Sequence, residues 1–126
     1  MLSKSPVAAT LPCKDLRAAR DFYTKKLGLD LTSGSVEDGY LEFSAGDGTL
    51  LQLFQSDSEK SDDTAATFEV DDLEKEMAEL RKKGVKFEEY DLPDIKTVDG
   101  VAEMGEHRGA WIKDPCGNIL GLHETA

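Results

Sequence analysis

Two stretches of the chain repeat one another in kind, and this internal repeat limits the possible folds more than any other feature. Residues 7–11 form a short apolar run followed by Asp15, and residues 65–70 form a similar run followed by Asp72. In both, a strand-compatible run precedes an aspartate placed to accept hydrogen bonds from the first turn of a helix. The repeat predicts two successive copies of one supersecondary unit.

Each aspartate introduces a helical stretch that ends at a glycine. Apolar residues recur at helical spacing, and the glycine then tolerates the left-handed conformation of a helix C-terminus. The first stretch contains Leu16, Ala19, Tyr23 and Leu27 before Gly28, and the second contains Leu73, Met77 and Leu80 before Gly84. The order of strand, helix and glycine therefore occurs twice.

Further strands are predicted after each helix, over residues 39–44, 49–55, 85–89, 109–113 and 118–123. Glycine and proline mark turns at residues 45–48 and 114–118. Residues 56–63 are polar and acidic, which is typical of a linker. Residues 91–106 carry few periodic apolar side chains, so we expect a loop or flap there.

Charge and composition exclude several classes of partner. The formal net charge of the 126 residues is -11, which disfavours binding to a nucleic-acid backbone or an anionic membrane surface. No apolar run approaches the length of a membrane span, and the first residues lack the apolar region of a secretory signal. We expect a cytoplasmic protein whose two cysteines, Cys13 and Cys116, are free thiols.

Three motifs point to a known family. They are LPCKDL at residues 11–16, DFYTKKLGL at residues 21–29 and AWIKDPCGNIL at residues 110–120. The first two resemble the opening strand and helix of the vicinal oxygen chelate superfamily, and the third resembles its closing hairpin. This superfamily includes glyoxalase I, extradiol dioxygenases, fosfomycin-resistance enzymes and bleomycin-resistance proteins.

The resemblance implies an α+β fold in which two tandem βαβββ units form a curved, cup-shaped mixed sheet with helices on the outside. One domain of residues 1–126 is expected, with unit 1 over about residues 5–56, a linker over about 57–63 and unit 2 over about 64–124. Relatives often complete the cup with a second subunit. A homodimer is therefore implied.

Metal-dependent relatives place His, Glu or Gln on the first and last strand of each unit. The matching positions here are Ala8, Gln52, Ala65 and Gly121. Only Gln52 has a donor atom, and one amide cannot replace the imidazole and carboxylate ligands of catalytic metals. We expect no metal at these positions and no cofactor.

Strand alternation selects candidate ligand-binding residues that face the cup. They are Thr10, Gln52, Phe54, Thr67, Trp111 and His123. Trp111, Phe54 and Tyr40 could instead fill the core. Glu69 and His123 are candidates for metal-free acid–base catalysis, or, with Gln52, for a displaced metal site. His107 is a residue of the pocket rim or an exposed loop side chain.

These observations favour a metal-independent protein that binds a small molecule, such as an antibiotic or an aromatic or cationic metabolite. The alternative is a glyoxalase-like lyase, isomerase or dioxygenase with a rearranged or absent metal site. An interaction module without a ligand is a third possibility. The fold alone does not choose among them.

Overall fold

The computed structural model describes residues 2–58 and 62–125 of the chain. It divides into two compact units, Met1–Lys60 and Ser61–Ala126, which are described separately below. No helix in the described part of the chain is long and apolar enough to cross a membrane.

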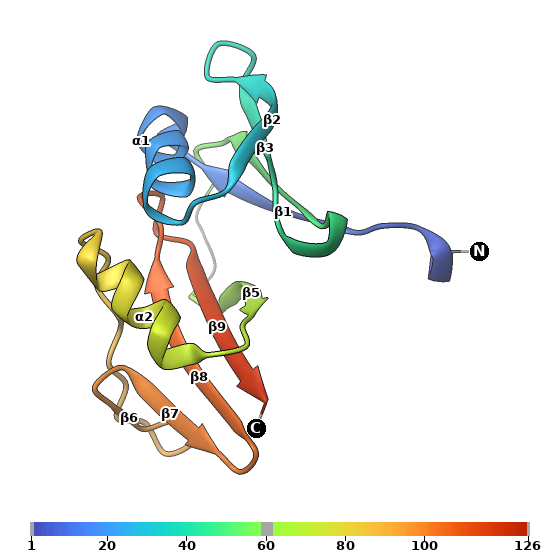
Figure 1. The fold of residues 1–126 in the computed structure, drawn as a ribbon. Coiled ribbons are helices and arrows are strands. Elements are labelled where there is room, and N and C mark those ends of the chain that lie inside the picture. Colours follow the sequence, from blue (N-terminus) through green and yellow to red (C-terminus); the bar gives the residue numbers. More distant parts are fainter. Residues whose placement is uncertain (1, 59–61, 126) are drawn as a thin grey trace. The chain divides into compact units, whose positions relative to one another are not determined.

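The described residues of unit 1 form a four-stranded mixed sheet with one α-helix and short 3-10 turns at Leu2–Lys4 and Gly46–Gly48. Its elements are β1 (Ala8–Cys13), α1 (Leu16–Asp21), a π-helical turn (Phe22–Lys26), β2 (Asp30–Ser35), β3 (Tyr40–Ser44) and β4 (Leu50–Gln55). The strand order is β1-β4-β3-β2, in which β1 runs parallel to β4 and the other pairs are antiparallel. Figure 1 shows α1 beside these strands. The first strand therefore pairs with the last.

The sequence explains why α1 covers only one face of this sheet. The Asp15 carboxylate accepts a hydrogen bond from the Ala18 amide at 3.1 Å, which starts the helix. Tyr23 then packs against Phe43 of β3, with ring centroids 5.2 Å apart. The alternate residues of β3 and β4 that face the helix are buried, namely Leu41, Phe43, Leu51 and Leu53. The residues between them lie on the opposite face, which we call the unit 1 open face.

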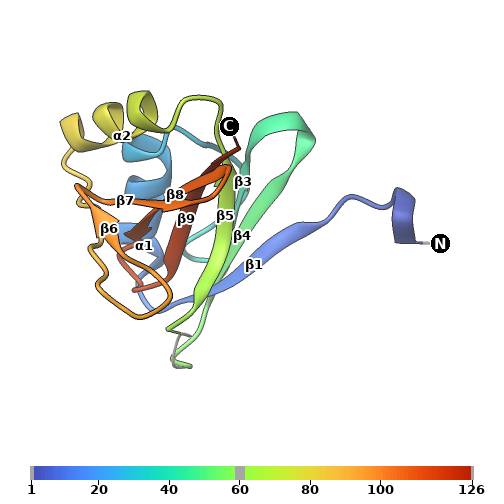
Figure 2. The same cartoon turned by 90° about the horizontal axis from the view of Figure 1, so that it is seen from below.

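Unit 2 repeats this plan with one more strand. It contains β5 (Thr64–Glu69), α2 (Leu73–Lys82), β6 (Thr97–Val98), β7 (Val101–Met104), β8 (His107–Lys113) and β9 (Ile119–Thr125). The order is β5-β9-β8-β7-β6, and β5 runs parallel to β9. Figures 1 and 2 place α2 on one side of β8 and β9. The side without the helix is the unit 2 open face.

Helix α2 is fixed to the sheet at its N-terminus. Asp72 accepts a hydrogen bond from the Lys75 amide at 3.2 Å, and Glu124 of β9 accepts one from the Leu73 amide at 2.6 Å. Both carboxylates also favour the positive end of the helix dipole. The predicted helices and their aspartate caps are therefore confirmed.

Three strand predictions need correction. Residues 85–89 do not form a strand, since only Phe87 makes an isolated bridge, to Ile112. The predicted loop 91–106 contains the β6–β7 hairpin, whose turn is Asp99-Gly100 with φ of 52° and 84°. Such an Asp-Gly pair is a strong hairpin signal that the periodicity argument overlooked. Strand β2 was not predicted because its sequence, DLTSGS, lacks apolar alternation.

The expectation of two free thiols is wrong, because Cys13 and Cys116 are both disulfide-bonded. The number of cysteines and their separation along the chain do not determine whether a thiol finds a partner in the fold. The cytoplasmic location thus loses the support that it drew from free thiols and stays a prediction.

Candidate functional site

The unit 1 open face carries a row of hydrogen-bonded polar side chains across four strands. Thr10 is opposite Gln52, and Gln52 is opposite Glu42. The Thr10 hydroxyl donates to Gln52 Oε1 at 3.2 Å, and Gln52 Nε2 donates to Glu42 Oε2 at 2.9 Å. The Thr32 hydroxyl contacts the other Glu42 oxygen at 3.3 Å. This row holds the Glu42 carboxylate on the face of the sheet away from α1.

Two aromatic side chains form the next row of the same face. Phe54 of β4 is opposite Tyr40 of β3, and about two fifths of each side chain is exposed. The Tyr40 hydroxyl contacts the Ser33 hydroxyl at 3.1 Å. An exposed aromatic pair beside a carboxylate can accept a flat ligand that carries a hydrogen-bond donor or a positive charge.

The unit 2 open face is built around Trp111 and two glycines. A side chain on Gly109 would meet the Trp111 ring at 3.3 Å, and one on Gly121 would meet Trp111 Nε1 at 3.5 Å and the Thr67 hydroxyl at 3.1 Å. The indole therefore lies close to the backbone of Gly109 and Gly121, which have no side chains to keep it at a distance. Tyr90 meets the indole edge to face, with centroids 5.5 Å apart.

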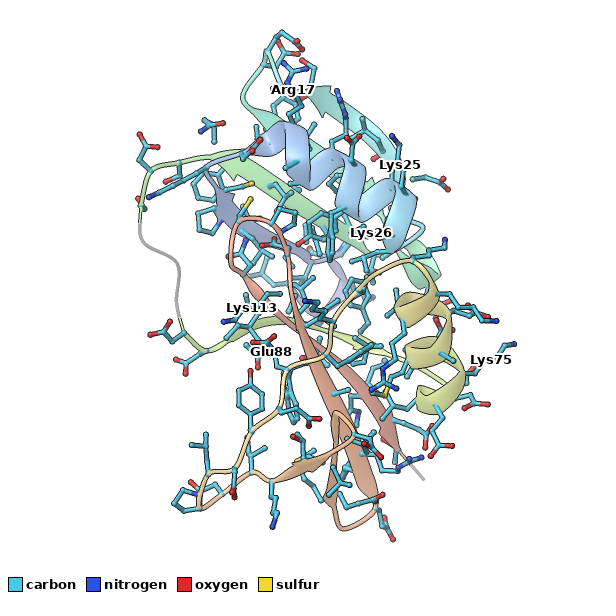
Figure 3. All side chains as sticks on the ribbon, turned by 90° about the vertical axis from the view of Figure 1, so that its left-hand side faces the viewer. Arg17, Lys25, Lys26, Lys75, Glu88 and Lys113 are labelled. Carbon is cyan, nitrogen blue, oxygen red and sulfur yellow. The ribbon has the colours of Figure 1, made fainter. Side chains whose placement is uncertain are left out.

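One ion pair lies close to Tyr90, the aromatic neighbour of Trp111. Lys113 forms a 3.3 Å ion pair with Glu88, and Figure 3 shows these two side chains together beside β8. The pKa of Tyr90 is raised, first because burial disfavours the phenolate and second because Glu88 adds negative charge, which Lys113 partly offsets. Tyr90 consequently remains a neutral phenol at neutral pH.

A chain of three ionisable side chains extends across the same face. Glu69 Oε2 lies 2.7 Å from His123 Nδ1, and His123 Nε2 lies 2.9 Å from His107 Nδ1. Glu69 and His123 are paired neighbours on β5 and β9, while His107 comes from β8. Such a chain can pass a proton or share a cation between its members.

The positions that match the family's metal ligands do not fit a metal ion. Ala8 and Ala65 have no donor, and Gly121 faces Thr67 and Trp111. The Gln52 amide is engaged at both ends, by Thr10 and by Glu42. Across residues 2–58 and 62–125, no group of three or more His, Cys, Asp or Glu side chains is arranged to hold a metal.

A separate cavity of about 570 Å³ lies on the helix side of unit 2. Its lining includes Arg81 and Arg108, both of which are engaged with the protein. Arg108 contacts Glu74, Glu103 and Glu124 at 2.7, 3.2 and 3.3 Å, and its pKa is raised chiefly by the hydrogen bond to Glu74. No residue predicted to bind a ligand lines this cavity.

The six predicted ligand-binding residues separate into two groups. Thr10, Gln52 and Phe54 lie on the unit 1 open face, and Thr67, Trp111 and His123 lie on the unit 2 open face. The acid–base candidates Glu69 and His123 are in direct contact. Glu42 is not among the predicted residues, although its place between the buried residues Leu41 and Phe43 was a usable signal.

The architecture defines an α+β protein of two βαβββ-like units, each with a mixed sheet that pairs its first strand with its last. The sequence model of the Glyoxalase/Bleomycin resistance protein/Dioxygenase superfamily matches residues 6–122. The chain belongs to this superfamily. The fold and family predicted from the sequence are therefore confirmed.

Solved structures of the same fold include binding proteins and enzymes. TnmS3, an antibiotic binding protein from Streptomyces sp. CB03234, is 23% identical, with coverage of 100% of this chain and 99% of that chain and a TM-score of 0.75. A putative glyoxalase family protein from Bacillus anthracis is 16% identical, with 98% and 96% coverage and a TM-score of 0.75.

Lactoylglutathione lyase from Agrobacterium tumefaciens is 20% identical, with 96% and 93% coverage and a TM-score of 0.68. Among curated proteins, none matches the chain. At these identities the likeness establishes the fold alone, so the chemistry of this chain depends on its own residues.

Proposed function

We propose that the protein binds an aromatic small molecule, such as an aromatic antibiotic. Binding would not use a metal ion at the family's ligand positions. The observation that carries the proposal is Trp111, whose indole lies against Gly109 and Gly121 beside the Thr67 hydroxyl. An aromatic surface with few hydrogen-bonding groups around it is the usual composition of a small-ligand site. The similarity to an antibiotic binding protein supports the same function.

The unit 1 open face, taken by itself, offers a second surface for an aromatic ligand. Glu42 offers a carboxylate next to exposed Tyr40 and Phe54, so an amine or other donor on the ligand would be favoured there. We propose that the functional form is a cytoplasmic homodimer of single-domain chains, as the family resemblance implies.

Tryptophan fluorescence tests the proposal directly, because Trp111 is the only tryptophan in the chain. A panel of polycyclic aromatic antibiotics and aromatic amines is titrated into protein kept in EDTA. We expect a saturable change in emission, and at 100 times its dissociation constant the bound compound should stabilise the fold by about 2.7 kcal/mol. The proposal fails if no compound changes either the emission or the melting temperature, a result that favours an interaction module.

A matched pair of glycine variants locates the binding surface. In Gly121→Ala the new methyl group would lie 3.1 Å from the Thr67 hydroxyl and 3.5 Å from Trp111 Nε1. Because this methyl group would displace the Thr67 hydroxyl or the Trp111 indole, we expect the affinity for the aromatic ligand to fall about tenfold, the equivalent of about 1.4 kcal/mol. Gly46→Ala is the control, since an added methyl group there meets no atom within 4 Å. Equal affinities of the two variants would place binding away from Trp111.

The contact between Glu69 and His123 favours a second candidate function, metal-free acid–base catalysis. Glu69 orients the His123 ring at 2.7 Å, and His107 continues the chain at 2.9 Å, so a proton could be exchanged through His107. An isomerase or lyase of this kind would convert its ligand in EDTA and lose most of its turnover in Glu69→Gln. A bound compound that is recovered unchanged from the wild-type protein excludes this candidate.

A further inference from the structure

The chain contains only two histidines, and the fold brings their ring nitrogens together. His107 Nδ1 lies 2.9 Å from His123 Nε2, whereas the ring centroids are 4.9 Å apart. The ring planes are inclined by 28° to one another, with these two nitrogens at hydrogen-bond distance. Both side chains extend from the unit 2 open face, where Gly109 of β8 pairs with His123 and places His107 two residues further along.

Glu69 determines which ring nitrogen of His123 carries the proton and which one presents a lone pair. Its carboxylate can only accept a hydrogen bond, so the proton of a neutral His123 ring is held on Nδ1, 2.7 Å from Glu69 Oε2. The Nε2 atom then presents its lone pair toward His107. A carboxylate bound to the far nitrogen of an imidazole is the arrangement that orients histidine ligands in metal sites.

We propose that His107 and His123 form a binding site for a divalent transition-metal ion of tetragonal geometry, copper(II) or nickel(II). Two nitrogens at roughly 2.0–2.1 Å from one ion lie about 2.9 Å apart when they subtend a right angle, as in tetragonal complexes. Tetrahedral coordination would separate them by roughly 3.4 Å. The separation of 2.9 Å is that of the hydrogen bond between the two rings, and it matches the right-angled arrangement.

Binding requires two local changes: a shift of the His107 proton from Nδ1 to Nε2, and a turn of the two rings that directs both lone pairs at the ion in place of the present hydrogen bond. His107 is exposed, so water can supply a hydrogen-bond partner at Nε2 after the shift. His123 keeps its tautomer, because Glu69 already fixes it. Water would fill the remaining coordination positions. This site is separate from the positions that match the family's ligands, and it does not depend on the proposed binding of an aromatic molecule.

Copper(II) added to the untagged protein tests the site without any organic ligand. We expect one ion per chain, with an electron paramagnetic resonance spectrum that shows coupling to two imidazole nitrogens. His107→Asn and His123→Ala should each lose that spectrum and weaken binding at least tenfold. Glu69→Ala should weaken binding about 10-fold, because it removes the group that orients His123.

Glu79→Ala is the matched control for Glu69→Ala, since Glu79 is an exposed carboxylate of α2. It should leave the copper affinity unchanged. The proposal is overturned if copper binds the His107→Asn variant as tightly as the wild type, which means that surface carboxylates or the amino terminus hold the ion. It is also overturned if the wild type binds no copper, which leaves a plain hydrogen bond between neutral rings. Either failure leaves the EDTA fluorescence experiment unaffected.

Discussion

Gly34 in β2 lies where a side chain would collide with the neighbouring strand. Its φ is 86°, and a side chain there would lie 2.3 Å from the Tyr40 carbonyl oxygen and 2.8 Å from the Tyr40 ring. The neighbouring strand therefore occupies the space of a missing methyl group. Only glycine combines this backbone conformation with so close an approach.

Gly34→Ala is expected to lower the free energy of unfolding by at least about 2 kcal/mol. The variant adds the strain of a positive φ to a clash with backbone atoms that cannot move independently. Urea unfolding followed by circular dichroism measures the effect, with Gly46→Ala, which meets no atom within 4 Å, as the control. A change under about 0.5 kcal/mol would show that β2 shifts freely away from β3.

Residue-level reasoning from the sequence identified side chains but not their partners. Strand alternation placed Gln52 and Thr10 on one face, and the structure joins them by a hydrogen bond. Strand alternation could not predict the contact of His107 with His123, because that contact depends on the register of β8 against β9. Alternation along one strand carries no information about register.

The β6–β7 hairpin is held by Glu89, a residue outside both strands. One oxygen of its carboxylate accepts hydrogen bonds from the Thr97 hydroxyl at 2.5 Å and from the Gly100 amide at 2.9 Å. These bonds lower the pKa of Glu89, the Thr97 hydroxyl contributing most and the charge of Arg81 adding to the effect. A lowered carboxyl pKa means that the ionised form stabilises the folded hairpin.

Acid should therefore loosen this hairpin before the rest of unit 2. The contribution of Glu89 is complete above the ordinary pKa of a glutamate and is lost as the pH falls through the lowered pKa. Hydrogen–deuterium exchange of residues 97–104 should speed up over this range relative to β8, after correction for intrinsic rates. Glu89→Gln should show the faster exchange already at pH 7. Protection that is unaffected by Glu89→Gln would assign the hairpin's stability to its backbone pairing.

Helices and strands with a regular apolar period could be predicted from the sequence. Strands that depend on pairing with a neighbour or on a tight turn could not. Helix α2 has an apolar stripe of Leu73 and Met77, both buried. Strand β2 has mostly exposed residues and depends on its pairing with β3. Apolar periodicity detects elements with one buried face, so it does not predict a strand that buries few side chains.

The charge of the whole molecule bears on its association. The chain carries a formal net charge of -11, so two copies in a homodimer repel one another over long range. We expect sedimentation velocity to give twice the 13.8 kDa chain mass, with dimerisation strengthened as salt rises from 20 to about 150 mM and the screening length shortens. A single species of chain mass at both salt concentrations would contradict the proposed dimer.

In each unit the first strand of the sequence pairs with the last, so this pairing can form only after the whole unit has been synthesised. Thr10 meets Gln52 across 42 positions, and Glu69 meets His123 across 54. During synthesis, helix α1 can form early, but β1 has no parallel partner until β4 has been made, and β5 likewise waits for β9. Loop closure over such spans slows folding. A ribosome that stalls before β9 would therefore leave β5 with both edges unpaired and able to pair with other chains.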